Sequence, residues 1–186
     1  NGVPLATGNT VTLGGVIKGD IITCAADTQD SFGASASTTE SITVANTAPV
    51  ISSITFTPST ITSQSPSLQC EETATDTDND SVTISYEWTL DGVTQTQTND
   101  TFTGPFSFAS LVTCKATPFD GTDSGETQEI SIQVGNDLPV VSAISFSPSP
   151  VYTDDILTLT ATIIDSNSTQ QNNLTVEIEW HVIDAN

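Results

Sequence analysis

The stretch Asp76-Thr-Asp-Asn-Asp-Ser-Val-Thr-Ile-Ser-Tyr-Glu-Trp88 decides the fold of this chain. It begins with three aspartates and then changes to a strict alternation. Apolar positions Val82, Ile84, Tyr86, Trp88 and Leu90 alternate with polar positions Thr83, Ser85, Glu87 and Thr89. A period of two residues is that of a half-buried β-strand. The stretch therefore predicts an acidic loop that leads into a strand with Trp88 on its inner face.

Cysteines lie on both sides of this strand. Cys70 precedes it in Leu68-Gln69-Cys70, and Cys114 follows it in Val112-Thr113-Cys114. Cys, Trp and Cys on three strands is the sequence signature of an immunoglobulin-like sandwich. We therefore expect a disulfide between Cys70 and Cys114, packed against Trp88. For the third cysteine, Cys24, we expect a buried free thiol, with an intermolecular disulfide as the alternative.

The composition indicates a secreted, strand-rich protein. The 186 residues carry 23 acidic and 2 basic side chains, a formal net charge of −21. Such a surface repels nucleic acid and anionic membranes and attracts cations. Three cysteines in a strand-rich sequence indicate an oxidising compartment, with one disulfide and one spare thiol. No apolar run is long enough to span a membrane. We expect an extracellular or cell-surface location, in a mature fragment or a part of something longer.

The sequence repeats itself with an offset of 90 residues. Pairs that match without gaps are Gly2 with Gly92, Cys24 with Cys114, Asn46 with Asn136, Pro49 with Pro139, and Phe56 with Phe146. After small insertions Trp88 matches Trp180 at an offset of 92. About 90 residues is the size of one sandwich. In the second copy of the Cys70 strand, we expect Ala161 at the place of the cysteine.

The phase of the repeat predicts an all-β chain of tandem immunoglobulin-like sandwiches, with one complete domain between two complementary half-domains. Residues 1–46 are the C-terminal half of one domain, 47–136 the complete domain, and 137–186 an N-terminal half. The half-domain at 137–186 should contain a strand with Leu174, Val176, Ile178 and Trp180 on one face. Asn46-Thr47-Ala48-Pro49 and Asn136-Asp137-Leu138-Pro139 are the expected linkers.

Each half-domain needs a partner, because half a sandwich exposes its apolar face and its unpaired edges. Residues 138–186 of one copy are expected to complete residues 1–46 of the next. This completion takes place either by strand complementation between subunits or by covalent continuation along one giant chain. The third interpretation is arbitrary trimming of a longer tandem array.

Three motifs give the chain a resemblance to a known class. They are Asp-Thr-Asp-Asn-Asp before Tyr86-Glu87-Trp88, the Cys114 strand followed by Phe119-Asp120-Gly121, and the linker from Asn136 to Pro139. With these, the chain resembles the tandem PKD-like or immunoglobulin-like repeats of prokaryotic extracellular surface proteins. The resemblance covers essentially the whole chain. It implies a stalk, an adhesin or a fibre subunit.

Acidic residues gather in two loops that meet at one end of such a sandwich. The metal ligands that we expect are Asp76, Asp78, Asp80, Asp120 and Asp123, with Asn46 and Thr47 approaching from the linker. Clustered carboxylate oxygens in a flexible cage suit Ca²⁺, and without a cation they repel each other. The alternative is a solvated acidic turn.

Glycosylation and catalysis complete the predictions from sequence. Asn79, Asn99, Asn167 and Asn173 each stand in an Asn-x-Ser/Thr triplet, the acceptor motif for N-glycans. The sole histidine, His181, gives no supported Ser-His-Asp triad, and a zinc site lacks ligands. We therefore expect no enzyme.

The expected function is a structural subunit or repeat segment of an extracellular filament or surface stalk, assembled head-to-tail with copies of itself. The alternatives are an adhesin repeat that binds glycan or protein ligands, and an accessory module of a large secreted enzyme. An exposed aromatic platform favours the adhesin, and a neighbouring catalytic domain favours the accessory module.

Overall fold

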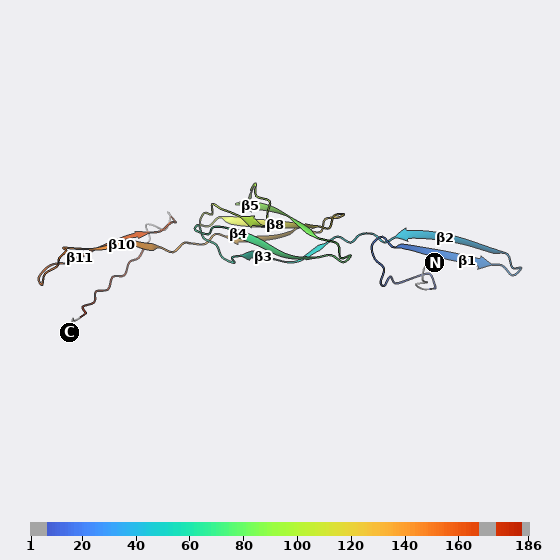
Figure 1. Ribbon diagram of the computed structural model, residues 1–186, viewed down its shortest axis with the longest axis horizontal. Helices are drawn as coiled ribbons and strands as arrows, with labels where there is room; N and C mark the ends of the chain where they lie inside the picture. The colour runs from blue at the N-terminus through green and yellow to red at the C-terminus, as the bar shows by residue number, and fades with distance from the viewer. Residues whose placement is uncertain (1–6, 168–173, 184–186) are drawn as a thin grey trace. The chain divides into compact units, whose positions relative to one another are not determined.

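The computed structural model describes residues 7–167 and 174–183, and these residues are all-β, as the sequence predicted (Figure 1). The strands are β1 (Ile21–Gln29), β2 (Ser35–Thr43), β3 (Val50–Thr57), β4 (Leu68–Thr75), β5 (Thr83–Leu90), β6 (Val93–Thr94), β7 (Thr101–Phe102), β8 (Leu111–Phe119), β9 (Gln128–Gln133), β10 (Val140–Ser147) and β11 (Thr158–Ile164). Within the described ranges there is no helix long and apolar enough to cross a membrane.

The strands form four sheets. β1 and β2 make an antiparallel hairpin, and β10 and β11 make another. Between them in sequence lie a three-stranded sheet in the order β3-β4-β7 and a four-stranded sheet in the order β6-β5-β8-β9. These two central sheets have the strand composition expected of a β-sandwich.

The chain divides into two compact units. One contains residues 1–54, 72–86 and 115–129, and the other contains residues 55–71, 87–114 and 130–186. Strands β3, β4, β5, β8 and β9 contribute residues to both units. The first unit holds the β1–β2 hairpin and the acidic loops, and the second holds the β10–β11 hairpin.

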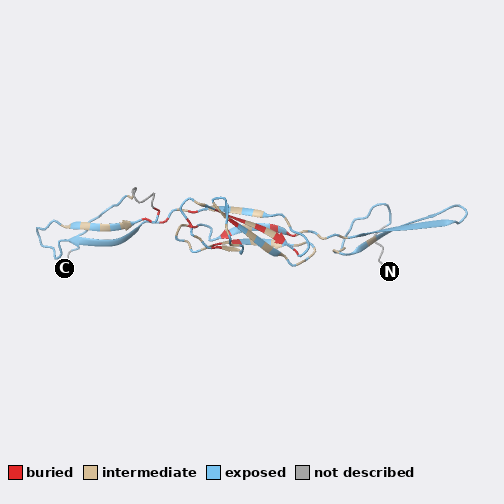
Figure 2. Ribbon diagram, turned by 90° about the horizontal axis from the view of Figure 1, so that it is seen from above, coloured by how far each residue is buried: buried red, intermediate tan, exposed pale blue. Residues whose placement is uncertain are grey.

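A disulfide and an aromatic stack join the two central sheets. Cys70 on β4 is bonded to Cys114 on β8, with 6.5 Å between their Cα atoms, which confirms the predicted pair. Trp88 on β5 is fully buried and stacks on Phe56 of β3 and Phe102 of β7, at centroid distances of 6.0 and 5.4 Å. The buried residues in Figure 2 lie mainly in this central part, whereas β1 and β2 are almost entirely exposed.

The β1–β2 hairpin is a structural copy of the β8–β9 pair. In β1–β2, Thr23 lies opposite Ser41, and their hydroxyl oxygens are 2.9 Å apart. In β8–β9, the matching hydroxyls of Thr113 and Ser131 are 2.8 Å apart. The offset of 90 therefore applies to both strands and to their pairing.

Cys24 of β1 is not covered by a second sheet within the described residues. The thiol is free, and the residue is exposed, so the expectation of a buried thiol is wrong for the chain as described. The physical reason is that β1 and β2 have no second sheet over them within the described residues. The matching residue Cys114 is buried because β4 covers it.

The β10–β11 hairpin repeats β3–β4, but with a different offset than the sequence suggested. Ser142 Oγ donates to Thr162 O at 3.1 Å, as Ser52 Oγ donates to Thr73 O at 3.1 Å. The offset is 90 on the first strand and 89 on the second, so Leu159 stands at the place of Cys70. Our expectation of Ala161 there was wrong, because it assumed too large an offset for the residues that follow the loop after Ser149.

The predicted strand at 174–180 is not formed as a strand. Residues 174–183 have no ladder partner among the described residues. Trp180 is nevertheless held 5.8 Å from Phe146 of β10, as Trp88 is held over Phe56, although 55% of Trp180 is exposed. The segment thus has the side-chain placement of β5 without its sheet. The domain boundaries at 46 and 136 stay a prediction.

Candidate functional site

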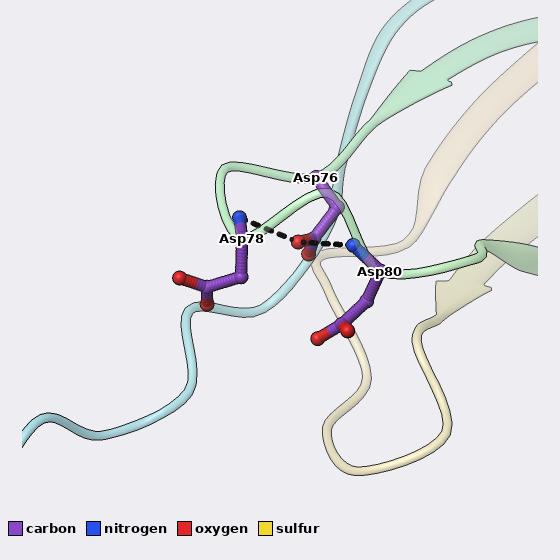
Figure 3. A group of neighbouring side chains, drawn as sticks. All are labelled: Asp76, Asp78 and Asp80. Atoms are coloured by element: carbon purple, nitrogen blue, oxygen red, sulfur yellow. Dashed lines mark hydrogen bonds between the residues drawn. The ribbon is translucent and has the colours of Figure 1, made fainter. Parts of the chain in front are cut away.

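The loop between β4 and β5 gathers three aspartates. Asp76 Oδ1 accepts hydrogen bonds from the backbone N–H groups of Asp78, at 2.7 Å, and Asp80, at 3.2 Å (Figure 3). Asn79 takes a left-handed backbone conformation, with φ of 63°, which asparagine tolerates better than most residues. The turn brings one oxygen of each carboxylate within 4.8 Å of the others. The side chains that we predicted to meet here do meet.

The loop after β8 forms hydrogen bonds with the linker. Asp120 is buried and accepts from the N–H groups of Thr122 and Asp123, at 2.7 and 2.8 Å. Asn46 Nδ2 donates to Asp120 Oδ2 and to Asp123 Oδ2, both at 2.8 Å. The hydrogen bond from Asn46, with those from the loop backbone, lowers the pKa of Asp120 below its ordinary value. A metal-binding role of Asp120 and Asp123 stays a prediction.

Thr47 and Pro49 complete a contact that we call the first joint, made of residues 46–49 and the loops 76–80 and 120–125. Thr47 N donates to Asp78 Oδ2 at 2.7 Å, as expected of a linker that approaches the acidic loop. A Cβ on Gly125 would lie 1.8 Å from Pro49 O, so only glycine allows this approach of the two backbones. The linker is therefore packed and hydrogen-bonded on the loops.

Lys18 supplies positive charge to the same loop. Its Nζ lies 2.5 Å from Asp80 Oδ2, although the sequence contains only 2 basic residues. The hydrogen bond to Asp80, with the charges of Asp80, Asp120 and Asp78, raises the pKa of Lys18. The ammonium thus already neutralises part of the acidic loop. The local sequence pattern around Lys18 gave no signal for this contact, which joins residues 62 positions apart.

A second joint, made of residues 136–139 and the loops 62–63 and 165–167, has the same construction. Asn167 N donates to Asp165 Oδ1 at 2.8 Å, which repeats the turn between Asp78 and Asp76. Asn167 Nδ2 donates to Asn136 Oδ1 at 2.6 Å, so the loop again contacts the linker. Both joints fix a linker to the loop that follows the second strand of a hairpin.

Asp137 is the centre of the second joint. Only 5% of the residue is exposed, and its carboxylate accepts from the hydroxyls of Ser63 and of Ser166, the latter at 2.7 Å. The hydrogen bond from Ser63, and then those from Thr62 and Ser166, lower the pKa of Asp137 against the opposing effect of burial. Sequence reasoning marked Asp137 only as a linker residue. Its acidic side chain beside Pro139 was the available signal.

The predicted glycosylation sites divide into three groups. Asn79 and Asn99 are exposed, as an acceptor requires. Asn167 is only 5% exposed, and its Nδ2, the atom that carries a glycan, is engaged with Asn136, so the structure disfavours modification there. Asn173 lies outside the described residues.

No protein-family model matches this chain, and no curated protein or solved structure matches it. We therefore infer the function from the geometry of the joints and of the two hairpins.

Proposed function

We propose that the chain is a structural subunit or repeat segment of an extracellular filament or surface stalk, assembled head-to-tail through immunoglobulin-like domains. The observation that carries the proposal is the β1–β2 hairpin, which repeats the register of β8–β9 without the sheet that covers β8–β9. An uncovered hairpin gains stability when further strands cover its apolar face and pair with its open edge.

The two joints support the same function. A chain of domains that bears load needs linkers of defined geometry, and packed, hydrogen-bonded linkers restrict rotation between neighbours. Here both linkers are held by side chains of an adjacent loop, through Asn46 and Thr47 in one case and Asn136 and Asp137 in the other. The disulfide suits an oxidising, extracellular setting.

The first experiment is to measure the mass of the native polypeptide, denatured and reduced, together with electron microscopy of the native material. A mass near 19.4 kDa together with filaments means that separate subunits complete each other. A mass many times larger, again with extended particles, means a covalent tandem array. Single compact particles at every concentration, whatever the mass, would contradict the proposal.

We further propose that Ca²⁺ occupies the loop of Asp76, Asp78 and Asp80 and stiffens the first joint. Three carboxylate oxygens within 4.8 Å of one another are hard ligands at a spacing that a cation can bridge. Lys18 competes with the cation for the carboxylate of Asp80, because its Nζ contacts Asp80. We therefore expect binding to be weak and to strengthen in the variant Lys18→Gln.

The measurement is thermal unfolding with added Ca²⁺ and with EDTA, for the natural sequence, Lys18→Gln and Asp78→Asn. Calcium should raise the melting temperature of the natural sequence, raise that of Lys18→Gln more, and leave that of Asp78→Asn unchanged. Equal melting temperatures with Ca²⁺ and EDTA in all three proteins would exclude the site.

A further inference from the structure

We propose that residues 174–182 of one copy pair with the open edge of β1 in a second copy, in a register that sets Trp180 opposite Cys24 and Leu159 across the core from it. The inference rests on the proposed function and deepens it, because it names the partner and the register.

The open edge is the one on β1. In the four-stranded sheet β8 lies between β5 and β9, and β9 is the outer strand. β1 corresponds to β8 and β2 to β9, but β1 pairs with β2 alone in the part of the chain that the structure describes. The missing neighbour of β1 therefore corresponds to β5.

The counterpart of β5 is present in the chain, at residues 174–182. Trp180 matches Trp88, and it contacts Phe146 as Trp88 contacts Phe56. Residues 174–183 belong to no sheet within the described ranges, so their backbone groups are available for a ladder. Within the described residues, the segment has no neighbouring strand, and β1 has no strand at the place of β5.

The apolar faces fit as well. The β10–β11 hairpin and the segment 174–180 enclose an apolar hollow of about 290 Å³. It is lined by residues that include Phe146, Leu159, Ile163, Ile178 and Trp180. In the central sheets, the apolar residues of β8 and of the segment after β9 are buried, namely Val112, Cys114, Ala116 and Val134. The residues of the first repeat at those places are Ile22, Cys24, Ala26 and Val44, which are small or apolar and are not buried within the chain.

The register follows from two hydrogen bonds to β8, one from β5 and one from the residue directly after β5. Ser85 Oγ donates to Thr117 O at 3.4 Å, and Asp91 N donates to Leu111 O at 2.8 Å. These antiparallel contacts set Trp88 opposite Cys114. Shifted to the repeats, they set Trp180 opposite Cys24. The disulfide from Cys70 to Cys114 shifts in the same way to Leu159 and Cys24.

The test uses Cys24 as a reporter, because a cysteine at the place of Cys70 should form a bond to it. Cα atoms 6.5 Å apart suffice for the disulfide from Cys70 to Cys114, so the same spacing is expected in the completed sandwich. Leu159→Cys is the test variant. Ala161→Cys, two residues along the same face of β11, is the matched control and represents the register that the sequence alignment suggested.

Both variants are oxidised as assembled material, run on non-reducing gels and mapped by mass spectrometry. For Leu159→Cys we expect a ladder of multiples of 19.4 kDa, lost on reduction, with the peptide of Cys24 bonded to the introduced thiol. For Ala161→Cys we expect only the background of the natural sequence. Removing the reporter, with Cys24→Ser in the Leu159→Cys background, should abolish the ladder.

Four results would overturn the inference. A stronger ladder for Ala161→Cys would mean that the register is wrong. Filaments seen by electron microscopy without a Cys24 crosslink in either variant would mean that the copies join elsewhere, with the proposed function intact. A crosslink confined to a single 19.4 kDa band would mean closure within one chain rather than between copies. Absence of any assembly in the natural sequence would refute the proposed function and the inference together.

Discussion

Asp137 and Asp120 show how single acidic residues are used in a chain that is almost without bases. Both are buried, and both have lowered pKa values because hydroxyl, amide or backbone donors face their carboxylates. The hydrogen bonds take the place of the salt bridges that 2 basic residues cannot supply. At this scale the negative charge is a structural component of the joints, and it is stabilised locally.

The pH dependence of stability should reflect Asp137. A carboxyl whose pKa is lowered by folding stabilises the native state above its ordinary pKa, and this contribution is lost as the pH falls through the lowered value. Asp137→Asn should therefore lower the melting temperature at neutral pH and flatten its decline as the pH falls below about 4, the ordinary pKa of an aspartate. The comparison is a series of thermal melts with the exposed Asp154→Asn as control. Parallel curves for both variants and the natural sequence would refute this role.

The elements of the chain divide into covered and uncovered copies of the same pairs. The disulfide joins β4 to β8, and the Trp88 stack joins β5 to β3, whereas the related residues of β10–β11 and β1–β2 are exposed or half-buried. The free energy of unfolding of the isolated chain should therefore come mainly from the central sheets.

The disulfide should contribute strongly to stability. It closes a loop with a sequence separation of 44, which corresponds to about 4 kcal/mol on the chain-entropy model. Replacing Cys70 and Cys114 together by Ala should lower the free energy of unfolding in urea by an amount of this order, while Cys24→Ala should leave it nearly unchanged. A thiol count on the unfolded, unreduced chain should give one thiol. A count of three would refute the bond.

The two tryptophans should separate folding from assembly. Trp88→Ala opens a cavity in a closed core and should cost about 3–5 kcal/mol of unfolding free energy. Trp180→Ala removes a side chain that is 55% exposed, so the melting temperature of the dilute chain should barely change. The same variant should prevent filament formation, measured by light scattering and electron microscopy. Normal filaments with Trp180→Ala would contradict strand complementation.

At the scale of the whole molecule, charge opposes the association that the hairpins favour. Each copy carries a formal net charge of −21, and the acidic residues are spread over the complete sequence. Copies that approach head-to-tail therefore repel each other at low ionic strength. Salt screens this repulsion, while the burial of apolar surface is much less sensitive to it.

Assembly should consequently increase with ionic strength. Between about 10 mM and 150 mM NaCl the Debye length falls from about 30 Å to about 8 Å, so repulsion between copies weakens. Sedimentation velocity at fixed protein concentration should show larger species at the higher salt concentration. Choline chloride serves as a control for specific effects of sodium. Dissociation on adding salt would mean that ion pairs, rather than apolar faces, hold the copies together.

The strand class, the repeat and the central disulfide could be read from the amino-acid sequence alone. Alternation around Trp88 predicts a strand from local chemistry alone, and Cys70 and Cys114 have the spacing of a known sandwich signature. The meeting of Asp76, Asp78 and Asp80 was also predictable, because three aspartates at alternate positions of one short turn cannot lie far apart.

The equivalence of residues between the repeats, and the partners of the charged side chains, become visible only in the folded chain. The match of Leu159 with Cys70 depends on the hydrogen bonds of Ser52 and Ser142, because inserted residues in a loop leave the alignment of a short polar strand ambiguous by one period. The pairing of Lys18 with Asp80, and of Ser63 with Asp137, joins residues 62 and 74 positions apart. Such contacts depend on how loops approach in space, and a local residue pattern contains no information about that approach.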